Sequence, residues 1–163
     1  MKYSGLILND MTAAPGLCVT FFTQGCPHRC PGCHNPESWN FDGGKDFTAE
    51  TLSTIIKGLT AQGIQRNLCI MGGEPLCEEN KALTHLVVSN VKNVLPEVKI
   101  YIWTGYYLEQ LEDPESQKIL KLTDYLIDGP FILAERDITL PMRGSRNQRI
   151  IALHNNELTN QEK

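Results

Sequence analysis

The sequence lacks a strong charge bias and any long apolar run. Its 163 residues carry 15 Lys and Arg against 19 Asp and Glu, a formal net charge of −4. We therefore expect no broad basic field for nucleic acid or a membrane surface. The apolar run near the start, Leu6 to Leu8, is too short for the core of a signal peptide, and no stretch approaches the length of a membrane span. These absences predict a cytoplasmic protein without a nucleic-acid or membrane partner.

A second group of closely spaced cysteines is also lacking. The chain has six cysteines, of which three are isolated from one another. In the reducing cytoplasm an even count does not imply disulfides, and isolated cysteines are most often small buried hydrophobic residues. We expect that role for Cys18, Cys69 and Cys77. The length fits one domain spanning residues 1–163, in which the polar residues 155–163 form a flexible tail.

What the sequence does contain is a loop with three cysteines, Cys26, Cys30 and Cys33, separated by Pro and Gly among other residues. Repeated Pro and Gly favour an irregular, tightly turning loop. Thiolates bind soft metals, so three of them in one loop indicate a metal or iron–sulfur centre. A structural zinc site is the alternative, with His28 or His34 as the fourth ligand, although zinc sites are usually assembled from two separated pairs of ligands.

Strands and helices are predicted to alternate along the chain. Apolar runs rich in β-branched residues indicate strands covered on both faces, and apolar stripes at helical spacing lie between them. Right-handed crossovers then give an α/β fold with a parallel sheet and helices on its outer face. Because there are too few units to close an eight-stranded barrel, we expect an open, partial (β/α) barrel. The strands are expected at 17–23, 67–71, 98–103, 124–127 and 148–153, and the helices at 48–63, 80–95 and a shorter region near 113–122.

Unusual sequences follow four of these strands directly. They are the cysteine loop, Gly-Gly-Glu-Pro at 72–75, Thr-Gly-Tyr at 104–106 and Asp-Gly-Pro-Phe at 128–131. In parallel α/β folds the carboxyl ends of the strands share one edge, where binding sites are built. The sequence therefore predicts an active site at this edge.

The spacing Cys-x3-Cys-x2-Cys of Cys26, Cys30 and Cys33 resembles that of the radical S-adenosylmethionine superfamily. The resemblance implies a [4Fe–4S] cluster held by the three cysteines, with one iron left open for S-adenosylmethionine. It also implies that the reduced cluster breaks the sulfonium C–S bond of this cosubstrate to give methionine and a 5′-deoxyadenosyl radical. In such enzymes the cofactor carries the chemistry and the protein positions it.

Gly72, Gly73, Glu74 and Pro75 strengthen the resemblance, because the superfamily carries a Gly-Gly-Glu segment that contacts the methionine amino group. Glycines allow a close backbone approach, and a carboxylate suits an ammonium group. An ordinary tight turn is the alternative. The chain departs from the superfamily where an aromatic residue commonly precedes the third cysteine. His34, just after that cysteine, is our candidate for packing against the adenine, with simple loop packing as the alternative.

Across nearly the whole chain the motifs are similar to those of the activating proteins of anaerobic ribonucleoside-triphosphate reductase. They include Trp-Thr-Gly-Tyr, Asp-Gly-Pro-Phe and Arg-Gly-Ser-Arg-Asn-Gln-Arg at 143–149. The resemblance implies hydrogen abstraction from a glycine α-carbon of the partner reductase, with the electron supplied by flavodoxin or a similar donor. The alternatives are activation of another glycyl radical enzyme, such as pyruvate formate-lyase, and a non-enzymatic zinc-binding module.

By the same resemblance, Thr104 and Asp128 bind S-adenosylmethionine, the latter near its ribose or carboxylate. Both are also typical turn residues that accept backbone N–H bonds, so a local structural role is the alternative. Arg143, Arg146 and Arg149 could contact the partner or the carboxylate of the cosubstrate, or simply form a solvated face.

Overall fold

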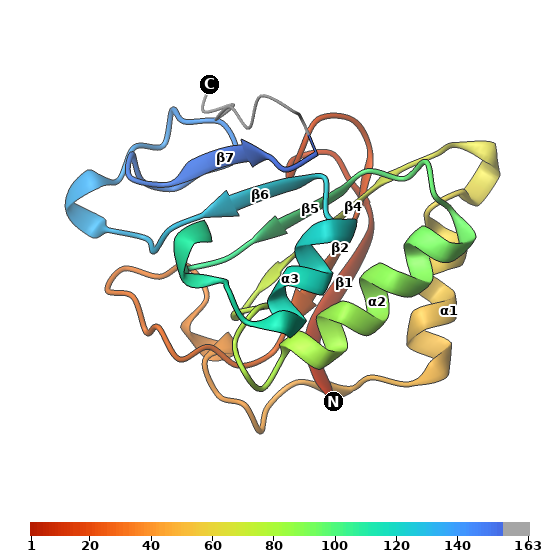
Figure 1. Cartoon of the computed structure of the whole chain (residues 1–163), viewed down its shortest axis with the longest axis horizontal. Helices are drawn as coiled ribbons and strands as arrows, with labels where there is room; N and C mark the ends of the chain where they lie inside the picture. The colour runs from red at the N-terminus through yellow and green to blue at the C-terminus, as the bar shows by residue number, and fades with distance from the viewer. Residues whose placement is uncertain (155–163) are drawn as a thin grey trace.

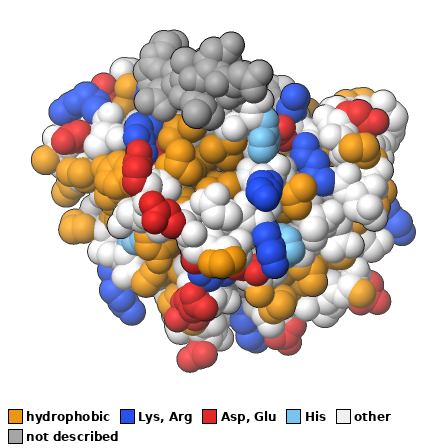
Figure 2. All heavy atoms as spheres, viewed as in Figure 1, with side chains coloured by type: hydrophobic (Ala, Val, Ile, Leu, Met, Phe, Trp, Pro, Cys, Tyr) orange, Lys and Arg blue, Asp and Glu red, His pale blue; other side chains and the backbone are white. Residues whose placement is uncertain are grey.

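The computed structural model describes residues 1–154, which form an α/β fold around one seven-stranded sheet in the order β3-β1-β2-β4-β5-β6-β7 (Figure 1). The tail predicted at 155–163 lies outside the described residues. Among the described residues, no helix combines the length and the apolar character needed to cross a membrane. On the face that Figure 2 shows, Lys and Arg side chains lie at several separate places.

The centre of the sheet is parallel, as predicted. β2 (Cys18–Thr23), β4 (Asn67–Gly72), β5 (Ile100–Trp103) and β6 (Tyr125–Asp128) are neighbours that run in one direction. Their residues are mostly buried, and a core cluster packs against each face of this part of the sheet. The apolar runs in the sequence predicted these four buried strands.

The edges of the sheet are antiparallel, which corrects the expectation of a parallel sheet throughout. β1 (Lys2–Asp10) was not predicted and pairs with β2, while β3 (Lys45–Asp46) pairs with β1. The predicted fifth strand exists as β7 (Arg149–Ala152), but it runs antiparallel to β6. The β6–β7 connection contains only the short 3-10 helix η4 (Leu133–Glu135), so the chain returns without the helical crossover that a parallel pair requires.

The three α-helices cover one face of the sheet, as Figure 1 shows. The first ends at Gly58 rather than at Gly63, and residues 61–63 form a separate 3-10 helix in which Gln62 has a φ of 55°. Thr48 and Asp113 cap the first and third helices by accepting the backbone N–H of the residue three positions on. The helices are α1 (Ala49–Gly58), α2 (Lys81–Val94) and α3 (Pro114–Leu122), with 3-10 helices η1 (Pro36–Ser38), η2 (Ala61–Gly63) and η3 (Leu108–Gln110).

Side-chain alternation along the strands separates two faces of the sheet. Val19 and Phe21 of β2 pack in the main core with residues of all three α-helices. Cys18 of β2 and Cys69 of β4 belong to a second cluster on the opposite face. Cys18, Cys69 and Cys77, here called the buried thiols, are each at most 1% exposed, which confirms their predicted burial. The three described α-helices thus pack on the face of Val19 and Phe21, and we call the opposite face the helix-free face.

Candidate functional site at the carboxyl edge of the sheet

A cavity of about 500 Å³ opens at the carboxyl ends of the parallel strands. Phe22, Met71 and Trp103 line it, and by strand alternation they lie on the helix-free face of the sheet, the same face as Cys18, Cys69 and Tyr101 of the second cluster. All four strand-end segments singled out in the sequence contribute lining residues. The prediction that these segments meet at one edge is confirmed.

The three cysteines of the loop all line this cavity. The Cys33 N–H donates to the Cys30 carbonyl at 3.1 Å in a turn whose Gly32 has a φ of +81°. The Asn35 N–H lies 3.4 Å from the Cys33 sulfur. Burial is the main cause that raises the pKa of the Cys26 thiol. A metal or cluster at this loop would bind the thiolate, so its binding would have to displace that proton.

Residues 1–154 contain no group of three or more His, Cys, Asp or Glu side chains gathered as a site for one metal ion. A four-coordinate zinc ion needs ligand atoms that converge on a single point. A cluster instead takes one thiolate at each of several irons. The loop supplies three thiolates, a number that serves three irons of a cluster but leaves a four-coordinate zinc ion one ligand short.

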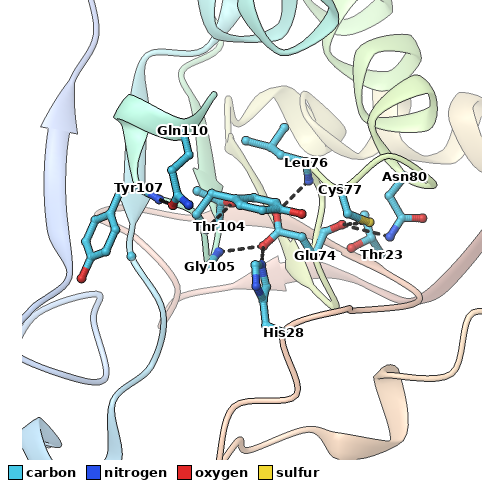
Figure 3. A network of polar contacts seen from close by, with 12 residues as sticks. Thr23, His28, Glu74, Leu76, Cys77, Asn80, Thr104, Gly105, Tyr107 and Gln110 are labelled. Carbon is cyan, nitrogen blue, oxygen red and sulfur yellow. Dashed lines mark hydrogen bonds and ion pairs between the residues drawn. The ribbon is translucent and has the colours of Figure 1, made fainter. Parts of the chain in front are cut away.

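The carboxylate of Glu74 is the most connected polar group beside the cavity (Figure 3). It is 1% exposed and accepts four hydrogen bonds. His28 Nε2 and the Gly105 N–H each lie 2.7 Å from Oε1. The Leu76 N–H at 2.8 Å and the Thr104 hydroxyl at 2.7 Å donate to Oε2. One buried carboxylate thus ties together the cysteine loop, its own loop and the segment after β5.

These contacts bear on two residues predicted to bind S-adenosylmethionine. The contacts to Glu74 all come from the chain itself, and Thr104 donates its hydroxyl proton to that carboxylate. Glu74 and Thr104 both line the cavity, where a ligand could reach them. Their contacts with S-adenosylmethionine stay predictions. The geometry adds a positioning role that the sequence did not indicate.

Gly72 and Gly73 are required by a close approach of two backbone segments. A Cβ on Gly73 would lie 2.3 Å from the Gly25 carbonyl oxygen, and one on Gly72 would lie 2.6 Å from the Thr23 nitrogen. The Gly73 N–H donates to the Thr23 carbonyl at 3.0 Å. Both glycines line the cavity, whereas the neighbouring Pro75 is buried and is not among the lining residues. The segment therefore packs closely on the start of the cysteine loop.

His34 lies on the cavity wall and is exposed. Its ring centroid is 6.2 Å from that of Phe131, with the two planes tilted by 46°. A flat ligand could meet both rings, and the adenine contact predicted for His34 stays a prediction.

Asp128 is fully buried and engaged elsewhere. Its two carboxylate oxygens accept a fork of hydrogen bonds from Arg149, and the Leu108 N–H donates at 2.7 Å. Arg149 also pairs with Glu109. Asp128 is not among the lining residues of the cavity, although its neighbour Gly129 is. Its predicted contact with the cosubstrate stays a prediction, and the observed contacts agree with the structural alternative.

Sequence reasoning missed Asn80 and gave His28 only a possible zinc-ligand role. The Asn80 amide donates to three carbonyls, those of Gln24, Gly25 and Glu74, at 2.9–3.1 Å. Asn80 directly precedes α2, where an Asn usually indicates a helix cap. Its partners lie up to 56 positions away, so no local pattern could have revealed this contact.

Comparison with known proteins places these features in a class. Residues 13–151 match the family model described as a 4Fe-4S single cluster domain. The matched range includes the whole cysteine loop and most of the cavity wall. The chain thus carries a domain of the iron–sulfur class.

Curated relatives narrow this class to one family. The anaerobic ribonucleoside-triphosphate reductase-activating protein of Vibrio cholerae is 37% identical over 151 residues, which cover 92% of this chain and 97% of the relative. Those of Haemophilus influenzae and Escherichia coli K12 are 38% and 34% identical, over 92% and 91% of this chain and 97% and 96% of the relatives. This chain belongs to the family of anaerobic ribonucleoside-triphosphate reductase-activating proteins.

Proposed function

We propose that this chain is a radical S-adenosylmethionine activase of anaerobic ribonucleoside-triphosphate reductase. The observation that carries the proposal is that Cys26, Cys30 and Cys33 line one cavity together with the Gly-Gly-Glu segment. The curated relatives named as activating proteins of this reductase support it. The bound [4Fe–4S] cluster would supply the electron that cleaves S-adenosylmethionine, and the reaction ends with hydrogen abstraction from a glycine of the reductase.

The three cysteines would hold the cluster. Their three thiolates would bind three of its irons, and the resemblance to the radical S-adenosylmethionine superfamily implies that the cosubstrate would bind at the remaining one. A structural zinc module, the alternative, would need a fourth protein ligand, and His28, one of the two candidates for it, instead has its Nε2 2.7 Å from Glu74 Oε1.

Glu74 and its partners would keep the cysteine loop in place. Through His28, which lies between the first two cysteines, the buried carboxylate fixes the loop against the segment after β5. A preorganised loop holds its thiols where the cluster needs them, so the cluster does not have to order the loop on binding. The protein therefore orders the cysteine loop before any cofactor is bound.

The cosubstrate would lie along the remaining cavity wall. We assign its contacts to Gly72, Gly73, Glu74, Pro75 and Thr104 on one side and to His34 and Asp128 on the other. Pro75 and Asp128 are not lining residues, so we propose that they act on the cosubstrate by positioning their neighbours Glu74 and Gly129, which do line the cavity.

The same proposal includes a single radical S-adenosylmethionine core domain over residues 1–163, built as an open, partial barrel. Four adjacent parallel strands with the cavity at their carboxyl ends support this assignment. We place the reaction in the cytoplasm, with a flavodoxin-like protein as the electron donor. An open edge suits a protein substrate, because the docked reductase itself can exclude water.

Anaerobic reconstitution tests the proposal. The loaded protein should contain about four irons per chain and, once reduced, should convert S-adenosylmethionine to methionine and 5′-deoxyadenosine. Cys30→Ala should lose this activity, whereas Cys18→Ala, which changes a buried thiol, should retain most of it. A fully loaded protein that leaves S-adenosylmethionine intact would refute the proposed function.

A further inference from the structure

Among residues 1–154, Arg143 is the one Arg or Lys that lines the cavity. Its Nε is buried and has no hydrogen-bond partner within residues 1–154. Its Nη1 donates to the Gln148 carbonyl at 3.3 Å. No described carboxylate lies within ion-pair distance of this guanidinium. Arg143 is half-buried, and a buried N–H without an acceptor on a guanidinium without a carboxylate partner is costly and calls for an explanation.

The neighbouring arginines of the same motif differ from it. Arg149 forms ion pairs with Asp128 and Glu109, and Arg146 is exposed. Burial lowers the pKa of Arg143, whereas the ion pairs of Arg149 raise its pKa. Of the three arginines that the sequence offered as contacts, the structure thus leaves Arg143 available inside the cavity.

The backbone around Arg143 is held in place. The Gly144 and Ser145 N–H groups donate to the side-chain oxygen of Gln148 at 2.8 and 3.0 Å, and the Gln148 amide donates to the Gly129 carbonyl at 2.9 Å. On the other side, Trp103 Nε1 donates to the Met142 carbonyl at 2.8 Å. A side chain that extends from such a fixed turn is preorganised for binding.

The chemistry of the cosubstrate identifies the partner of this cation. S-adenosylmethionine has a sulfonium and an ammonium, which are cationic, and its carboxylate is its only anionic group. A guanidinium binds carboxylates with two parallel N–H donors. The two acidic residues assigned to the site, Glu74 and Asp128, accept hydrogen bonds from other residues of the chain. The carboxylate that would pair with Arg143 is therefore that of the cosubstrate.

We propose that Arg143 binds the carboxylate of the methionine moiety of S-adenosylmethionine. This inference rests on the proposed function and extends it by assigning one binding residue. The contact would orient the amino-acid end of the cosubstrate relative to the cysteine loop. The Nε that has no partner among the described residues would gain an acceptor.

Binding measurements on the cluster-loaded, unreduced protein test the assignment. Equilibrium dialysis would compare S-adenosylmethionine with decarboxylated S-adenosylmethionine, for the unchanged chain, Arg143→Gln, Arg143→Lys and the exposed control Arg146→Gln. Because a hydrogen bond to a charged group contributes about 1.5–3 kcal/mol, Arg143→Gln should raise the Kd of S-adenosylmethionine about 10- to 100-fold. Arg143→Lys should raise it less, since the charge remains.

The decarboxylated ligand separates a direct contact from a structural effect. Its Kd should be nearly the same for the unchanged chain and Arg143→Gln, and Arg146→Gln should change neither Kd. An unchanged Kd for S-adenosylmethionine in Arg143→Gln, or an equal loss for both ligands, would overturn the inference and leave the proposed function standing. A loaded, unchanged chain that does not bind S-adenosylmethionine would overturn the proposed function and this inference with it.

Discussion

Replacing Glu74 by Gln should destabilise the chain even without a cofactor. The carboxylate accepts two backbone N–H bonds, from Leu76 and Gly105, and bonds from His28 and Thr104. A Gln amide offers one oxygen and one NH₂ group. The Thr104 hydroxyl or the His28 ring can adapt to an added donor, but a backbone N–H cannot. In either amide orientation, one buried N–H therefore loses its acceptor.

The cost follows from that count. An unsatisfied buried donor costs about 1–3 kcal/mol, and the remaining hydrogen bonds lose the extra strength that a charged acceptor gives. We expect Glu74→Gln to lower the free energy of unfolding by about 3 kcal/mol. Urea unfolding of the cofactor-free chain, followed by circular dichroism, measures this quantity. Glu79→Gln is the matched control, because Glu79 is exposed in the same segment and should change stability by no more than about 0.5 kcal/mol. A loss below about 1 kcal/mol for Glu74→Gln would refute the positioning role.

Three further outcomes are expected. Gly105→Ala places a Cβ 2.6 Å from the His28 ring, so the ring must move, its contact with Glu74 weakens, and a chelator should remove the cluster iron faster; an unchanged rate would contradict this. The Lys81 ion pair lowers the pKa of Asp113, so the stability that the charge adds is present above the unfolded pKa of about 4 and is lost as the pH falls through the lower folded value. Asp113→Asn should therefore cost about 0.5–1 kcal/mol at neutral pH, and a difference that persists in strong acid would contradict this. Burial raises the pKa of Cys77 to about 12, so alkylation of the native cofactor-free chain, read by mass spectrometry, should modify the loop cysteines before the buried thiols.

The four central strands were predictable because each is encoded by a short apolar run within its own segment of sequence. Four apolar runs, each covered on both faces, gave the parallel strands, and the unusual sequences after them gave the edge that carries the cavity. β1 escaped prediction because its apolar residues are consecutive and half exposed, so they show neither alternation nor full burial. The direction of β7 depended on a connection without a helix, which no strand pattern reveals.

The candidate site was predictable in its members but not in their roles. The motifs selected Glu74 and Asp128, yet apart from Leu76 the hydrogen-bond partners of their carboxylates lie 20–46 positions away in the sequence, which no local pattern encodes. Arg143 could not be distinguished from its neighbours in the sequence, because only the folded chain shows that it lines the cavity whereas Arg149 is ion-paired and Arg146 is exposed. Long-range hydrogen bonds decide these roles, and sequence spacing does not encode them.

Electron paramagnetic resonance on the anaerobic reductase tests the proposed activity most directly. The cluster-loaded, reduced chain should generate a glycyl radical doublet on the reductase when S-adenosylmethionine is present. Omitting the cosubstrate or using Cys30→Ala should abolish the signal, and Cys18→Ala should retain it. Absence of the doublet with the unchanged, loaded chain would contradict the proposal that this protein activates the reductase.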